Sequence, residues 1–230
     1  MLTIFLLITI KKYFLNILTL KNIIIQKTFY FQSIFGLIFL LLVLAPTSAF
    51  SQQHTYSVIK GNKKIGSLSV TRANEQNKIK YSIWSEARTG FILNIKINVL
   101  IEEWFEKGEL VHSKFIRKVN GIEIINNEVE KFKDIYTLKQ KGDYTKTLSS
   151  DIKYTTASMY FIEPVNMPFV YSENYQQLIQ VIDFGKNKYL VEFPDGNRSY
   201  YTYRNGICTT VEAHTSWSVV FFKLAVPLFN

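Results

Sequence analysis

The sequence predicts an all-β, mainly antiparallel protein: a curved meander sheet or incomplete β-barrel with one short helix. Along most of the chain after residue 52, apolar residues alternate with polar ones, as in strands with one buried face. Turn dipeptides such as Asn-Gly and Asp-Gly separate these segments at short intervals. Strands joined by tight turns pair with their sequence neighbours, which favours an antiparallel sheet over parallel βαβ units.

Residues 1–51 are expected to be a leader, followed by a single antiparallel β domain over residues 52–230. Lysines precede an apolar run at 35–44, and small residues follow it, which is typical of a secretory signal. Cleavage is expected after Ser51, with Ala49 at the third position back; cleavage after Ala49 is the alternative. The run is shorter than the roughly 20 residues of a spanning helix, so an uncleaved membrane anchor is the less favoured interpretation.

The domain is expected to open with a hairpin. Residues 56–59 and 65–70 have the alternation of strands, and Gly61-Asn62 lies between them as a turn. A third strand is expected around residues 79–84, where Ile, Tyr and Ile alternate with Lys, Ser and Trp.

The next strand is long, and its apolar side chains form a candidate face for an apolar ligand. Polar residues such as Lys96 and Asn98 occupy the alternate positions, so a register shift of one residue would bury them. We therefore expect the apolar face to line the interior, with a bulge near Glu102-Glu103 before the strand continues to Phe105. The candidate face consists of Phe91, Leu93, Ile95, Ile97, Val99 and Ile101.

Turn signals divide the rest of the chain into further strands. Asn120-Gly121 and Asn205-Gly206 suit type I′ hairpins, because Asn and Gly tolerate positive φ. The strands expected in this part are residues 178–183, 189–193 and 200–203. A short helix is expected over residues 155–162, with Thr155 as its cap and Pro164 ending it, followed by a loop to Gln177.

Several of these segments resemble a known family. They are Tyr56-Ser57-Val58, the run from Ala157 to Pro164, Val170-Tyr171-Ser172-Glu173, Phe193-Pro194-Asp195-Gly196-Asn197 and the run from Tyr200 to Gly206. Together they resemble the exported bacterial β-proteins of domain of unknown function 6134, over roughly residues 55–224. The resemblance implies a secreted or periplasmic β-rich domain. It implies no activity and no site residues, because the shared motifs are turns and aromatic residues.

No catalytic site, cofactor site or metal site is predicted. Glu212 and His214 share a strand face, but a metal site needs three or four ligands. Glu102 and Glu103 are adjacent, so in a regular strand they point to opposite faces and do not form a catalytic pair. Cys208 is the single cysteine and is expected to be a small buried residue.

The charge pattern argues against nucleic-acid binding. The chain carries +9, but four of its 27 basic residues and none of its 18 acidic residues precede Gln52, which leaves +5 for the domain. Basic and acidic residues are interspersed, whereas nucleic-acid binding needs a clustered basic face.

Two functions remain open, both for an exported protein of the periplasm or cell envelope. In the first, the concavity of the sheet binds an apolar or lipid-like ligand. In the second, the core is filled, and the domain is a structural or interaction module whose partner is an envelope protein. An enzyme is the third and least favoured class. Contact with a membrane is expected only through an uncleaved leader.

Overall fold

A computed structural model describes residues 51–75, 77–89, 95–216 and 218–225. These residues form one antiparallel sheet of 14 strands, which confirms the predicted fold class. The strands of the first half are β1 (Ser51–Lys60), β2 (Lys63–Glu75), β3 (Lys78–Thr89), β4 (Ile95–Glu106), β5 (Glu109–Val119), β6 (Ile122–Phe132), β7 (Ile135–Gln140) and β8 (Asp143–Leu148). No helix in the described part of the chain has the length and hydropathy to cross a membrane.

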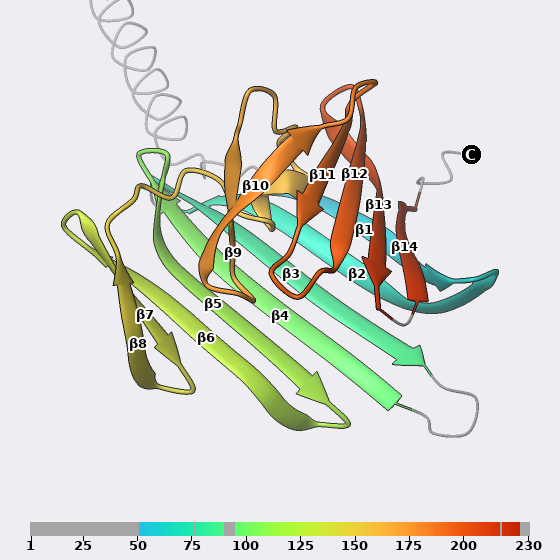
Figure 1. Cartoon of the computed structure of the whole chain (residues 1–230), viewed down its shortest axis with the longest axis horizontal. Helices are drawn as coiled ribbons and strands as arrows, with labels where there is room; N and C mark the ends of the chain where they lie inside the picture. Colours follow the sequence, from blue (N-terminus) through green and yellow to red (C-terminus); the bar gives the residue numbers. More distant parts are fainter. Residues whose placement is uncertain (1–50, 76, 90–94, 217, 226–230) are drawn as a thin grey trace, which may run out of the picture. The chain divides into compact units, whose positions relative to one another are not determined.

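The second half of the sheet runs back to its starting point. Its strands are β9 (Phe169–Ser172), β10 (Gln177–Asp183), β11 (Lys188–Glu192), β12 (Arg198–Arg204), β13 (Ile207–Thr215) and β14 (Ser218–Leu224). Each strand pairs with its sequence neighbour, and β14 pairs with β1, so β8 and β9 are the two edges of an open sheet. Figure 1 shows β9–β14 crossing over one face of the longer strands β2–β4.

The two halves share one core. Its buried residues include Val70, Ile83 and Ile101 from the first half and Val181, Tyr201 and Val211 from the second. A second cluster around Tyr81, Phe105, Leu138 and Tyr171 continues it toward β7. The side of the sheet that holds these clusters is called the inner face below.

The connection between the edge strands β8 and β9 runs along the inner face. Leu110 donates a backbone hydrogen bond to Ile152, and Tyr171 donates one to Tyr154, so this segment is held by β5 and then by β9. The expected helix over 155–162 is shorter in the structure: it is one 3-10 turn, η1 (Ser158–Tyr160). We call residues 152–162 the plug.

The helix is short because its first side chains close a local turn. The backbone N–H of Ser158 donates to Thr155 Oγ1, and Ser158 Oγ donates to the carbonyl of Thr155. Such side-chain bonds compete with a continuing helix, and the helical bonding ends where Phe161 and Ile162 donate to the carbonyl of Ser158. The N-cap position of the turn is Ala157, which forms no side-chain capping bond, so the expected cap at Thr155 is wrong for this shorter element.

The predicted hairpin turns are confirmed, whereas the predicted bulge is displaced. Both residues of Asn120-Gly121 and of Asn205-Gly206 have positive φ, as a type I′ turn requires. The β4–β5 register shifts between Trp104 and Phe105, one step beyond the expected Glu102-Glu103. Glu103 therefore lies on the inner face, as the alternation along β4 requires.

Gly66 and Gly206 are required for two different reasons, a close backbone approach and a positive φ. A Cβ atom at Gly66 would lie 2.0 Å from the carbonyl oxygen of Glu86 on β3, whereas one at Gly206 meets no atom within 4 Å but requires a positive φ of 75°. We expect Gly66→Ala to lower the free energy of unfolding by about 3 kcal/mol through the backbone clash. Gly206→Ala is expected to cost about 1 kcal/mol. Chemical denaturation measures both, and equal losses would contradict the close approach of β2 and β3.

Candidate functional site

The structure divides the predicted apolar face into a buried part and a half-exposed part. Ile101 is buried in the main core cluster, and Val99 packs against that cluster. Ile95 and Ile97 are only half-buried. Phe91 and Leu93 lie outside the described residues. The face thus runs from the core toward one end of the sheet.

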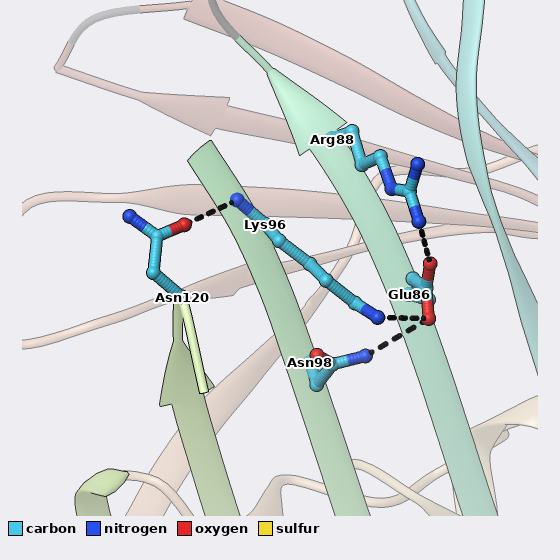
Figure 2. A network of polar contacts seen from close by, with 5 residues as sticks. All are labelled: Glu86, Arg88, Lys96, Asn98 and Asn120. Carbon is cyan, nitrogen blue, oxygen red and sulfur yellow. Dashed lines mark hydrogen bonds and ion pairs between the residues drawn. The ribbon is translucent and has the colours of Figure 1, made fainter. Parts of the chain in front are cut away.

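The opposite face of β3 and β4 carries charge and faces solvent at this end. Figure 2 shows the carboxylate of Glu86 as the centre of a polar network. It accepts hydrogen bonds from Lys96 Nζ at 3.0 Å, and from Arg88 and Asn98 at 3.3 Å. The bond from Lys96 is the main reason why the pKa of Glu86 lies below its usual range. This network leaves the apolar side chains of β4 to the inner face.

Two rows of paired residues extend the inner face across four strands. Ala87 on β3 pairs with Ile97 on β4, which pairs with Val119 on β5. Directly paired residues of an antiparallel sheet lie on the same face and touch. In the next row, Val99 pairs with Arg117 on β5, and Arg117 pairs with Ile125 on β6. All six are half-buried, and we call them the open-end face: Ala87, Ile97, Val99, Arg117, Val119 and Ile125.

Arg117 is the single charged member of the open-end face. Its guanidinium lies 5.5 Å from the ring centre of Phe115. Desolvation by burial lowers its pKa, and the opposing influences of Tyr175 and Asp195 raise it. Within the described residues, Arg117 forms no hydrogen bond and no ion pair with another side chain.

The centre of the concavity, by contrast, is filled by the plug. Tyr160 makes edge-on ring contacts with Tyr56 and Tyr201, at 5.2 and 6.3 Å between ring centres. The hydroxyl of Tyr203 donates to the carbonyl of Met159 at 2.7 Å. Both plug residues are buried. A ligand therefore has no room at the centre unless the plug moves.

Two clefts open beside the plug. One of 430 Å³ lies between Tyr81, Phe105 and Ile162, and Lys107, Glu109 and Lys153 also line it. The other, of 380 Å³, is lined by Pro164, Met167, Val181 and Tyr189 among others. The first cleft is rimmed by charge, and neither includes a residue of the open-end face.

The plug is anchored by two buried glutamates, Glu103 on β4 and Glu173 after β9. Thr155 Oγ1 donates to Glu103 at 2.6 Å, and the N–H of Ala157 donates to Glu173 at 3.0 Å. The hydroxyl of Thr156 also donates to Glu173. The relative exposures of Glu103 and Glu173 are 0% and 2%.

The two carboxyl groups interact directly. Burial, then the charge of Glu173 and a hydrogen bond to it, raise the pKa of Glu103 well above its usual range. This shift favours the protonated form of Glu103, because two buried like charges in contact are strongly unfavourable. Through its bonds to Thr155 and Ala157, the pair connects β4 and the turn after β9 to the plug.

The acid pair is closed to solvent and has no place for a substrate. Asn127 Nδ2 donates to the carbonyls of Glu173 and Asn174, at 2.9 Å each, and so fixes the turn after β9. The buried hydroxyl of Tyr171 lacks a hydrogen-bond partner in the described structure. A catalytic carboxyl must touch a reacting group, so this geometry indicates a structural role.

The sequence separated Glu102 from Glu103 but gave no partner for Glu103. Glu102 does point outward, where it forms an ion pair with Lys80 at 3.0 Å. Glu103 continues the apolar positions of Val99 and Ile101, and an acid at such a position was the available signal. Glu173 follows a short strand in a loop, where no periodicity marks the direction of a side chain.

The other His, Glu and Cys residues considered for metal binding or catalysis do not come together in one site. His214 and Glu212 are in contact at 2.7 Å on the outer side of β13. Another group, His112, Glu128 and Glu130, brings possible ligand atoms within 4.8 Å of one another. Lys139 already pairs with Glu130 at 2.9 Å. Cys208 is buried, and burial raises the pKa of its thiol to about 12, which suits a packing role.

Comparisons with known proteins identify a family for the chain. Residues 56–225 match the family described as Domain of unknown function (DUF6134). The chain belongs to this family. A crystal structure titled as a β-barrel-like protein of domain of unknown function DUF1849 from Brucella abortus is 12% identical, with a TM-score of 0.47, over 75% of this chain and 94% of the other. The comparison with curated proteins gave no match. Family membership confirms the resemblance seen in the sequence and supplies no activity.

The acid pair gives this DUF6134 domain a defined pH dependence. Between the ordinary glutamic acid pKa and the raised folded-state pKa of Glu103, the unfolded chain loses a proton that the folded chain keeps. Stability therefore falls as pH rises through this window, by up to about 1.4 kcal/mol per pH unit. Glu103→Gln keeps the size of the side chain and one accepting oxygen but removes the titration, so its free energy of unfolding should fall less from pH 5 to 8.

Glu102→Gln is the matched control, since Glu102 is the outward neighbour of Glu103. Denaturant titrations across pH should show the wild-type slope in Glu102→Gln and a flatter slope in Glu103→Gln. The same slope in all three proteins would show that Glu103 does not hold a proton in the folded state.

Proposed function

We propose that this chain is an exported cell-envelope protein whose domain binds an apolar or lipid-like molecule at the open-end face. The observation that carries the proposal is the half-exposed pair of apolar rows that continues the core at one end of the inner face. Monomeric proteins rarely leave a contiguous apolar surface of this kind without a binding role. Export is supported by the sequence of the leader.

Because the centre of the concavity is filled, the proposed ligand site lies at the end of the sheet. Met159 and Tyr160 occupy the middle of the concavity, so a ligand is best placed where the plug stops. Val220 and Phe222 of β14 are also partly buried against the same core cluster and supply further apolar surface. Covering each half-exposed aliphatic side chain contributes about 1 kcal/mol. Several such contacts suffice for reversible binding of one acyl chain.

A structural or interaction module remains the second candidate. Its support is the packing of both core clusters around the plug, which leaves the centre complete without a ligand. An envelope protein would then be the partner. Large exposed side chains at the β6–β7 turn, Phe132 at 73% and Ile135 at 49%, offer a surface for such a contact.

The binding site is tested with an apolar fluorescent probe, N-phenyl-1-naphthylamine. Ile97→Asp places a charge between Ala87 and Val119, so we expect about a tenfold loss of probe affinity. Since Ile97 is half-exposed, the free energy of unfolding should fall by only about 1–2 kcal/mol. Phe132→Asp is the control, because it makes the same kind of change at the far end of β6 and should leave affinity unaltered. Failure of the wild type to bind the probe would favour the module.

Export is tested by sequencing the N-terminus of the protein isolated from its native cells. The small residues that follow the apolar run predict a mature chain that starts at Gln52. An intact Met1 on a cytoplasmic species would contradict export.

A further inference from the structure

We propose that the open-end face selects ligands with an anionic headgroup, such as a long-chain carboxylate, and that Arg117 binds that group. The inference rests on the proposed function and names the ligand class for the same site. A carboxylate on an acyl chain would place its chain on the aliphatic residues and its charge at the guanidinium.

The position of Arg117 within the rows supports this ligand class. Val99 and Ile125 are its paired neighbours on the two adjacent strands, so its side chain rises from an apolar surface. Phe115, two positions earlier on the same face, is buried beneath it, and the guanidinium lies 5.5 Å from the ring centre. A cation held in such surroundings is partly desolvated. A bound anion would replace the hydrogen bonds that the cation no longer makes with water.

The guanidinium keeps its hydrogen-bonding capacity for a ligand. In the described part of the chain no carboxylate lies within ion-pair distance of Arg117, although ten other ion pairs form. Guanidinium N–H groups match the two oxygens of a carboxylate in a planar, bidentate arrangement. An alcohol offers one neutral acceptor oxygen and an alkyl end offers none, so both interact with these donors more weakly than a carboxylate does, which produces the selection.

Asp195 is the acid that influences Arg117 from the second half of the sheet, and its hydrogen bonds are already taken. It accepts from the N–H of Asn197 at 3.0 Å and from Asn197 Nδ2 at 2.7 Å, within its own turn. The hydroxyl of Tyr175 donates to it as well. Tyr175 in turn stacks on Phe193 at 5.4 Å between ring centres. Asp195 therefore stays in its turn, where its charge opposes an incoming anion and tunes the affinity downward.

The experiment compares two ligands of equal chain length, dodecanoate and dodecanol, by displacement of N-phenyl-1-naphthylamine from the mature domain. The wild type should bind dodecanoate about tenfold more tightly than dodecanol, as expected for a charge-assisted hydrogen bond. Arg117→Met keeps a long apolar side chain and should remove that preference while dodecanol binding stays unchanged. Lys118→Met is the matched control, because Lys118 is exposed on the other face of β5 and should keep the preference.

A third variant tests the same charge balance in the opposite direction. Asp195→Asn retains a turn-forming side chain and removes the opposing charge, so dodecanoate should bind more tightly than to the wild type while dodecanol is unaffected. Equal affinities for both ligands in the wild type would overturn the role of Arg117 and leave the proposed function standing. Binding of neither ligand, in a domain whose unfolding midpoint is intact, would overturn both.

Discussion

The contact between Glu103 and Glu173 holds the plug against the inner face of this open sheet. Strand pairing joins the two halves of the meander through β1 and β14, and the edges β8 and β9 do not pair with each other. The plug forms backbone hydrogen bonds to β5 and β9, and the two glutamates hold it through Thr155, Thr156 and Ala157. Burial beside Glu173 raises the pKa of Glu103, because a second negative charge there would be uncompensated. The filled centre of the concavity follows from this anchoring.

A filled centre changes what a curved sheet can bind. In a barrel with an empty interior the ligand is enclosed, whereas here Met159 and Tyr160 take that space. The apolar alternation of β4 nevertheless continues past the plug to Ile97 and Ile95, which are half-exposed. The structure thus contains a feature that suits each of the two functions left open by the sequence: a completed core beneath and an unfilled apolar surface at one end. Arg117 is the charged residue on which the proposed ligand preference of that surface depends.

The sequence predicted the sheet well because its signals are local. Alternation along β4 and the positive φ of Asn-Gly turns depend on adjacent residues alone, and both recur in the structure. The β14–β1 pairing, the plug and the acid pair depend on residues far apart, such as Glu103 and Glu173, which no local pattern connects. Arg117 escaped notice for a related reason: its apolar neighbours Val99 and Ile125 belong to other strands.

The position of a bound ligand is the most direct test of this account. Methyl-labelled Ile, Val and Met side chains report contacts with unlabelled dodecanoate through intermolecular NOEs. The account predicts contacts from the acyl chain to Ile97, Val99 and Ile125, with none to the buried methyl of Met159. Contacts to Met159 or Ile83 would contradict it, because they would require the ligand to displace the plug and enter the centre of the concavity.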